Sequence, residues 1–329
     1  MTLSRRRFLH LAAGATALPA GLRRSWAQTY PTRPVTIVVP AAPGGATDFA
    51  ARLLAEGLAK TFGVQFVVEN KGGASGNLGI TAAARAAPDG HTLLLAYSGY
   101  QVANPALYPN LAWHRLRSFA PVALAIVAPH VVMTRKNLPA RSLAEFVAYA
   151  RQHPGKINYA SSGLGSIQHI GAEQLGLLGE IKMVHVPYRG AGPAMNDLLA
   201  GTVDLFITTP PSAFGHIQAG TVNALAMASK RRHPMLPDVP TSAEAGMPGF
   251  ELDAWFAAYA PAGTPAPVIE RLAGAIETIV KGESFRERAE QAGAYATYMG
   301  PAQLARFTET ELDHWSAVIR KAGITGEAQ

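Results

Sequence analysis

The chain has 329 residues, of which 48% are apolar and 16% are charged, and this composition excludes a disordered or coiled-coil protein. At roughly 100–200 residues per domain, the length is sufficient for two domains. The chain has no cysteine, which excludes a disulfide framework, a thiolate metal site and a cysteine nucleophile.

The net charge of +7 is concentrated at the N-terminus. Residues 1–27 contain five arginines and no other charged residue. The remaining chain therefore carries 24 basic and 22 acidic residues, a net charge of +2. The basic character therefore belongs to a leading segment, and we expect no nucleic-acid partner.

That leading segment is typical of an export signal. Arginines at positions 5–7 precede Phe-Leu and a weakly apolar stretch at 11–22. The pattern resembles a twin-arginine signal, although His10 stands where lysine is more common. The alternative, a membrane anchor, is disfavoured because the stretch is shorter than ~20 residues and contains Pro19. We predict a signal peptide over 1–27, cleaved near Ala27, and a periplasmic mature protein.

In the mature chain, short β-branched runs alternate with helical patterns, which predicts an α/β fold with largely parallel sheets. Strands are expected at 35–39, 65–69, 92–96, 122–127, 131–134, 157–160, 183–186, 203–208, 223–228 and 254–260. Helices are expected at 48–61, 77–86, 142–152, 166–178, 191–200 and 211–219. After residue 264 we expect only three helices, at 266–280, 283–292 and 301–321, and no strand.

Two proline-containing stretches predict crossings between domains. Pro129 divides one long β-like run, and prolines at 234, 237 and 240 form a rigid connection that is neither helix nor central strand. Two crossings predict one domain built from both ends of the mature chain, 28–128 and 230–329, and a second domain inserted between them, 129–229.

Turns rich in glycine and hydroxyl side chains follow six of the predicted strands, at 40–48, 70–77, 97–100, 161–166, 187–191 and 208–211. Taken singly, such a turn is more often a helix cap than a ligand site. Taken together they predict a cleft between the domains, because ligands of open α/β sheets bind at the carboxyl ends of the strands. Helix N-termini and hydroxyl donors there suit a carboxylate.

Two charged residues in these turns have open roles. Arg189 either pairs with a ligand carboxylate or stays in solvent at the rim of the cleft. Asp48 either caps a helix, as Thr47 also can, or receives the ammonium group of an amino-acid ligand. The predicted ligand contacts are Pro43, Gly44, Gly45, Ala46, Thr47, Asp48, Ala74, Ser75, Asn77, Ser98, Ser162, Gly163, Gly165, Ser166, His169, Tyr188, Arg189 and Gly190.

Signatures of catalysis are scarce. The sequence contains no phosphate-binding loop, no Gly-x-Ser-x-Gly elbow and no His-Glu-x-x-His, so we expect no cofactor and no metal. Ser166 and His169 share one face of a predicted helix start, and a secreted serine hydrolase would use them as nucleophile and base. The simpler interpretation is a helix cap beside a histidine on the helix face. Asp204, at a strand start, is expected to be structural.

Motifs along the chain resemble the solute-binding receptors of the tripartite tricarboxylate transporters, the Bug receptor family. They are YPTRPV at 30–35, PGGATD at 43–48, VENKGG at 68–73, GLGS at 163–166 with His169, HVPYRG at 185–190, GTVD at 201–204, PDVPT at 237–241 and APAGTP at 260–265. The order of these motifs along the chain makes the resemblance far more specific than any one of them.

The resemblance implies a two-domain α/β periplasmic binding protein of type II, with a ligand clasped in the cleft between domains. It implies a non-enzymatic receptor, expected as a monomer, that hands a small carboxylate or amino acid to a membrane permease. Two residues depart from the family pattern, because Ser75 and Ala257 stand where glycine is common. Ser75 adds a hydroxyl at the cleft, and we expect this hydroxyl to influence which ligand is preferred.

Overall fold

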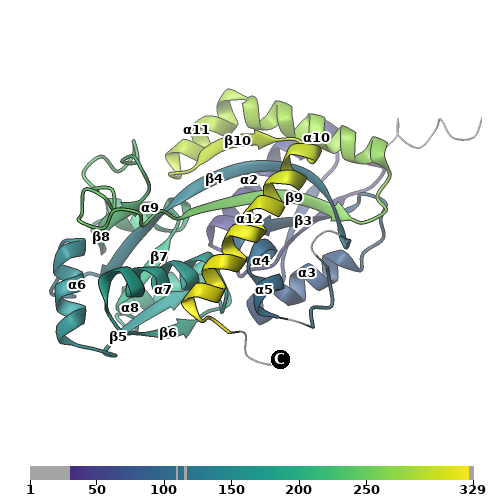
Figure 1. Ribbon diagram of the computed structural model, residues 1–329. Coiled ribbons are helices and arrows are strands. Elements are labelled where there is room, and N and C mark those ends of the chain that lie inside the picture. Colours follow the sequence, from purple (N-terminus) through teal and green to yellow (C-terminus); the bar gives the residue numbers. More distant parts are fainter. Residues whose placement is uncertain (1–29, 109, 115–116, 326–329) are drawn as a thin grey trace, which may run out of the picture.

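The computed structural model describes residues 30–108, 110–114 and 117–325 (Figure 1). The signal peptide predicted over 1–27 lies outside these residues and stays a prediction.

Within the described residues, strands pair in the order β2-β1-β3-β9-β4-β7-β5-β6, and β8 and β10 also pair with β4. β1 is parallel to β2 and β3, and β5 is parallel to β6 and β7, whereas β4 pairs only antiparallel. The expectation of largely parallel sheets therefore holds for the two ends and not for the centre. The strands are β1 (Val35–Val39), β2 (Phe66–Asn70), β3 (Thr92–Tyr97), β4 (Phe119–Arg135), β5 (Ile157–Ser161), β6 (Met183–Pro187), β7 (Leu205–Thr208), β8 (Val222–Ala228), β9 (Asp253–Pro261) and β10 (Tyr295–Met299).

β4 runs unbroken through Pro129 and joins the two ends of the molecule as a long arc (Figure 1). The prediction that Pro129 divides this run into two strands is wrong. Proline is compatible with an extended backbone and only lacks the N–H, and here it marks the point where the strand changes partners. Residues 119–129 pair with β9, and residues 130–135 pair with β8. The predicted boundary between residues 128 and 129 falls at this point, and the domain division itself stays a prediction.

The helices match the predicted ones to within two residues at most ends. α10 shows why: Val268, Leu272 and Ile276 recur at a spacing of four and are all buried. Among the described residues, no helix combines the length and the apolar character that crossing a membrane requires. The longer helices are α2 (Ala46–Phe62), α3 (Asn77–Ala84), α6 (Leu143–Gln152), α7 (Ile167–Gly179), α8 (Ala191–Ala200), α9 (Pro210–Gln218), α10 (Ala266–Lys281), α11 (Glu283–Gln291) and α12 (Pro301–Ala322).

Several short elements were not expected. The turn predicted at 97–100 is the start of helix α4 (Ser98–Val102), which is followed by α5 (Asn104–Leu107), and η1 (Ala74–Gly76) precedes α3. The expectation of no strand after residue 264 is wrong, because β10 pairs antiparallel with β4. Its sequence, YATYM, is aromatic and β-branched, but at five residues it is too short to stand out between two helices.

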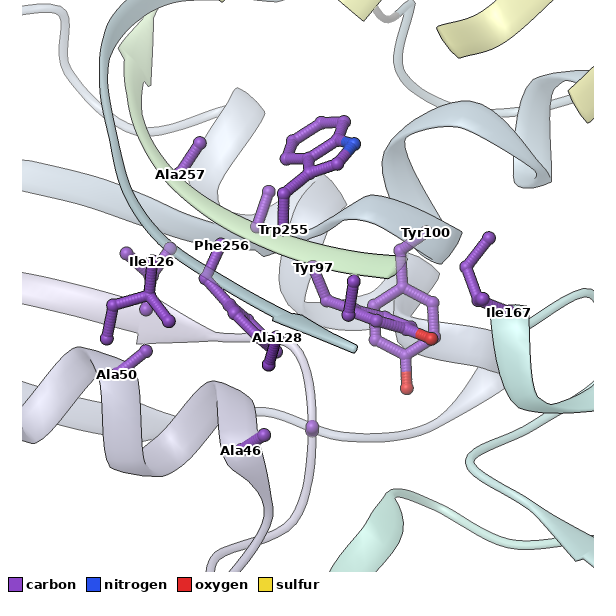
Figure 2. Close-up of a cluster of buried hydrophobic side chains, with 14 of the residues drawn as sticks. Ala46, Ala50, Tyr97, Tyr100, Ile126, Ala128, Ile167, Trp255, Phe256 and Ala257 are labelled. Atoms are coloured by element: carbon purple, nitrogen blue, oxygen red, sulfur yellow. The ribbon is translucent and has the colours of Figure 1, made fainter. Parts of the chain in front are cut away.

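The core lies where the central strands meet the helices on either side. On β9, Trp255 and Phe256 are both buried and point to opposite sides of the strand (Figure 2). The indole Nε1 of Trp255 donates a hydrogen bond to Glu311 on α12, at 3.2 Å. The ring of Phe256 stacks on Tyr97 of β3, with centroids 5.8 Å apart. α12 continues from there to contact both α4 and α7, so it packs on elements of both ends of the molecule.

Candidate ligand-binding site

Turns from the two ends of the molecule line a small cavity of about 20 Å³, which we call the inner cavity. It lies at the carboxyl ends of strands from both parallel sets, as expected for an open α/β sheet. The residues that line it are Ala41, Gly45, Ala46, Thr47, Tyr97, Tyr100, Ser162, Gln168, Gly190, Ala191, Thr209, Ser212 and Phe256.

The first wall of the inner cavity is the turn between β1 and α2. Gly45 is the N-cap of α2 and makes no side-chain capping bond, so neither Thr47 nor Asp48 caps the helix as predicted. Instead Asp48 braces the turn from behind: its carboxylate accepts hydrogen bonds from the Gly44 N–H, at 3.2 Å, and from Arg52 and Asn70. The Asp48 side chain is thereby fully occupied and does not line the inner cavity.

Asp48 stays ionised at neutral pH. Burial by itself would raise the pKa of this carboxyl, but the hydrogen bonds from Arg52, Asn70 and Gly44 outweigh burial and lower the pKa below 3.8. The charge is paired with Arg52, at 2.9 Å, and therefore adds little net charge to the inner cavity.

The opposite wall is the turn between β6 and α8. Gly190 is the N-cap residue of α8 and has φ +132°, a conformation that favours glycine. The carbonyl of Arg189 accepts a 2.9 Å hydrogen bond from the Ala42 N–H, so the two turns are joined directly. A Cβ on Gly192 would lie only 2.4 Å from the carbonyl oxygen of Pro43. Only glycine allows the two turns to approach this closely.

A third helix begins at the same place. α9 follows Thr209, and its Ser212 hydroxyl accepts a 3.0 Å hydrogen bond from the Ala46 N–H of α2. The N-termini of α2, α8 and α9 therefore converge on the inner cavity. The first N–H groups of a helix have no partner within the helix and carry the positive end of its dipole, so the three termini together favour an anion.

Two tyrosines and a glutamine form the remaining wall. Tyr97 donates to the side chain of Gln168, at 3.0 Å, and Tyr100 donates to the carbonyl of Ser162, at 3.0 Å. The rings of Tyr97, at the end of β3, and Tyr100, on α4, meet edge to face with centroids 5.3 Å apart (Figure 2). Burial raises the pKa of both, that of Tyr100 to about 12, so both remain neutral donors. No described residue lining the inner cavity has a charged side chain.

A second, larger cavity of about 260 Å³ adjoins the inner one, and we call it the outer cavity. Tyr100 and Ser162 line both. The outer cavity is lined by Gly73, Ala74, Ser75, Gly76, Tyr100, Tyr108, Ser162, Gly163, Leu164, Pro187, Tyr188 and Arg189.

Comparison with known proteins identifies the family to which a chain with this arrangement belongs. Residues 50–324 match the family described as "Tripartite tricarboxylate transporter family receptor". The chain belongs to this receptor family. Its function is accordingly that of a solute-binding receptor, a non-enzymatic part of a transport system, with the α/β periplasmic binding protein fold.

Solved structures of similar proteins cover nearly the whole described chain. The periplasmic binding protein BugD is 38% identical, with a TM-score of 0.87, over 91% of this chain and 100% of its own. Rpa4515 of R. palustris, solved with adipate, is 34% identical, with a TM-score of 0.88, over 91% and 100%. MatC of Rhodopseudomonas palustris, solved with bound malate, is 38% identical, with a TM-score of 0.84, over 88% and 100%.

In this receptor, Ser166 and His169 do not form a nucleophile–base pair. The Ser166 hydroxyl accepts the backbone N–H of His169, as the N-cap of α7, and the His169 Nδ1 accepts the Gly165 N–H, at 3.1 Å. The imidazole stacks on that of His185, with centroids 4.0 Å apart. Burial, together with the neighbouring His185, lowers the pKa of His169 to about 3. Neither Ser166 nor His169 lines either cavity.

The predicted contacts, Ser166 and His169 included, divide into four groups. Gly45, Ala46, Thr47, Ser162 and Gly190 line the inner cavity. The outer cavity is lined by Ala74, Ser75, Ser162, Gly163, Tyr188 and Arg189. A separate surface hollow beside α8 takes Pro43 and Gly44, and the remaining members, Asp48, Asn77, Ser98, Gly165, Ser166 and His169, lie behind the turns.

Two members of the last group show what such residues do. The side-chain oxygen of Asn77 accepts hydrogen bonds from Asn104 and Trp113, each at 3.0 Å. The Ser98 hydroxyl accepts the Trp255 N–H, at 3.4 Å. These contacts hold α3 and α4 in place behind the cavities.

Sequence reasoning missed Gln168, Ala191, Thr209 and Ser212, all of which line the inner cavity. The turn at 208–211 was recognised but contributed no predicted contact. The start of the predicted helix after this turn was a signal that could have identified Ser212, because Ser212 lies in the first turn of α9. In the described part of the chain, no cluster of three metal-ligating side chains occurs.

Proposed function

We propose that the protein is a periplasmic receptor that captures a small organic carboxylate and delivers it to the membrane permease of a tripartite tricarboxylate-type transporter. The observation that carries this proposal is the inner cavity: three helix N-termini converge on it, and no described lining residue is charged. Such a site binds a carboxylate by N–H and O–H donors, with helix dipoles in place of a counter-ion.

The relatives support the ligand class. Rpa4515 was solved with adipate and MatC with malate, both organic acids, and both share the fold of this chain over almost its full described length. The N-terminal segment supports export, through a twin-arginine type signal that is removed near Ala27. The bonds that join the turns across the inner cavity support capture by closure of two domains, 28–128 with 230–329 and 129–229.

Thermal unfolding of residues 28–329 tests this function against a panel of organic acids, amino acids and neutral solutes. A ligand at about 100 times its dissociation constant adds about 2.7 kcal/mol to the stability of the folded state. We expect a raised midpoint with organic acids, and chromatography of the mixture shows the acid unconsumed. Stabilisation by neutral solutes only, or by none of the panel, contradicts the proposal.

A further inference from the structure

Away from the inner and outer cavities, a hollow of about 520 Å³ lies where the chain passes between the two ends of the molecule, and we call it the crossing hollow. Val127 and Pro129 line it from β4, where that strand changes partners. Residues within 229–234 and 251–253, the two ends of the segment that connects β8 to β9, also line it. No described residue that lines the inner or outer cavity lines the crossing hollow, so it is a separate feature.

The strand register fixes which side chains form the floor of the crossing hollow. Tyr295 of β10 is paired with Val127, and Asp253 of β9 is paired with Pro129. Residues paired across antiparallel strands have their side chains on the same face, and so do residues two apart on one strand. All four side chains therefore share one face of the sheet, and all four residues line the hollow. The carboxylate of Asp253 thus lies on the same floor as an aromatic ring.

Asp253 lacks a partner of opposite charge. Within the part of the chain that the structure describes, its carboxylate forms no ion pair, and the residue is exposed to solvent from the open side of the hollow. Partial burial, together with the nearby carboxylates of Glu251 and Glu311, raises the pKa of Asp253 above 3.8. A bound cation would favour the ionised form, so this part of the floor attracts a positively charged group.

Three consecutive basic residues also line the crossing hollow. Lys230 forms an ion pair of 3.7 Å with Glu251, and Arg232 forms one of 2.8 Å with Glu244. Arg231, between them, forms no ion pair with any described residue. One positive and one negative charge at the hollow are therefore left uncompensated.

The two uncompensated charges meet at Tyr295. Burial raises the pKa of the Tyr295 hydroxyl, the charge of Arg231 opposes this rise, and the charge of Asp253 adds to it. Arg231 and Asp253 therefore both lie close enough to this hydroxyl to act on it. The ring of Tyr295 is held in place by the ring of His233, with centroids 5.3 Å apart.

We propose that the crossing hollow binds a small zwitterion, with its ammonium group at Asp253, its acid group at Arg231 and its carbon chain over Tyr295. A simple anion is repelled by Asp253 and a simple cation by Arg231, whereas a ligand that carries both charges satisfies both. The ring face of Tyr295 adds to the attraction for the ammonium group, and the hollow has the volume of a small-molecule site. This site goes beyond the proposed function, since it uses neither the inner nor the outer cavity.

The test uses ligands of one chain length that differ only in charge. 2-Aminobutyrate and 4-aminobutyrate carry both charges, butyrate carries only the negative one and butylamine only the positive one. Calorimetric titration of the mature protein compares the wild type with Asp253→Asn and Arg231→Gln. Asp313→Asn is the matched control, because Asp313 is an exposed residue of α12 that does not line the hollow. Gly192→Ala, which alters the turns at the inner cavity, is the control for binding in the cleft.

We expect at least one aminobutyrate to bind the wild type more tightly than butylamine does. Asp253→Asn and Arg231→Gln should each lower that affinity by about tenfold to a hundredfold, the range for a hydrogen bond to a charged group. Asp313→Asn and Gly192→Ala should keep it, and any binding of butyrate should be the same in Asp253→Asn as in the wild type.

Two results overturn the second site. One is the absence of binding by both aminobutyrates. The other is binding that Gly192→Ala weakens and Asp253→Asn does not, which places the zwitterion in the cleft. Neither result affects the receptor function, because stabilisation by the panel of organic acids tests that function separately.

Discussion

The two ends of the molecule support their cavity turns by opposite electrostatic means. Behind the turn at the start of α2, the ionised Asp48 accepts hydrogen bonds from Arg52, Asn70 and the Gly44 N–H. Behind the turn that follows β5, the neutral rings of His169 and His185 are stacked, and the Ser161 hydroxyl lies 2.6 Å from the His185 Nε2. The side chains of neither support line the inner cavity, but the two supports respond differently to acid.

Lowering the pH from 7 to 5 should weaken the histidine support and leave the Asp48 support unchanged. The pKa values of His169 and His185 are about 3 and about 4 in the folded protein, both lowered first by burial, against about 6.5 in the unfolded chain. The unfolded state therefore takes up protons first, and stability falls as the pH drops from about 6.5 towards 4. At pH 5 each ring contributes about 2 kcal/mol of this loss.

Urea unfolding at the two pH values measures that loss. His169→Gln should lose about 2 kcal/mol less than the wild type between pH 7 and pH 5, because one titrating ring is gone. Asp48→Asn is the control and should lose as much stability between pH 7 and pH 5 as the wild type does. The pKa of Asp48 lies below 3.8, so the contribution of its carboxylate to stability does not change over this range. An identical loss in the wild type and in His169→Gln contradicts this account.

The contact between the two turns is the next target. In Gly192→Ala, the new Cβ would lie 2.4 Å from the Pro43 carbonyl oxygen, so the turns are pushed apart while both supports stay intact. Overpacking of this size costs about 1–3 kcal/mol, which corresponds to a loss of ligand affinity of about tenfold to a hundredfold. Gly274→Ala on α10, where a Cβ meets nothing within 4 Å, should bind as the wild type does. Calorimetric titration distinguishes them, and unchanged affinity in Gly192→Ala would exclude this role.

Ser166→Ala tests the helix cap of the second support. Loss of the hydroxyl leaves the His169 N–H without its acceptor, and a missing N-cap costs about 1 kcal/mol. We expect this loss in urea unfolding, with ligand affinity reduced only slightly because Ser166 lines neither cavity. A catalytic serine would behave differently: its removal would abolish turnover of a hydrolysable ester while leaving stability almost unchanged.

The smallest effect is expected from backbone strain. The second turn of the first end places Ala74 and Ser75 at positive φ, whereas the turns of the second end use glycine at Gly163, Gly165 and Gly190. Ala74→Gly should therefore raise the free energy of unfolding by up to about 1 kcal/mol. Ala83→Gly, at a buried position inside α3, is the matched control and should lower it. Destabilisation by Ala74→Gly would mean that the turn carries no strain.

Sequence periodicity located most of the fold because the parallel strands are short apolar runs and the long helices repeat every three to four residues. It failed at β10 and α4, where five residues are too few to define a period. It also failed at Pro129, because a missing N–H does not end a strand that changes partners at that residue.

The sequence predicted the kind of site, a cleft lined by helix N-termini, but only some of the residues that line it. Glycine-rich turns identified the residues whose backbone approaches the cavities, such as Gly45 and Gly190. Gln168 and Ser212 reach the inner cavity through contacts with Tyr97 and Ala46, distant in sequence, which no local pattern encodes. The charge of Asp48 was visible in the sequence, but its three donors were not.

The unbroken path of β4 has a consequence for how the cleft moves. A loop hinge rotates about one or two bonds at almost no cost, whereas here residues 119–135 cross from one set of strands to the other as a single ribbon. If the two domains open and close as proposed, that ribbon must bend, so the cost in free energy rises with the amplitude of the motion. Pro129 lies where the strand changes partners and offers no N–H to a neighbouring strand. Under the proposed closure of two domains, a continuous strand therefore favours one relative position of the domains over others.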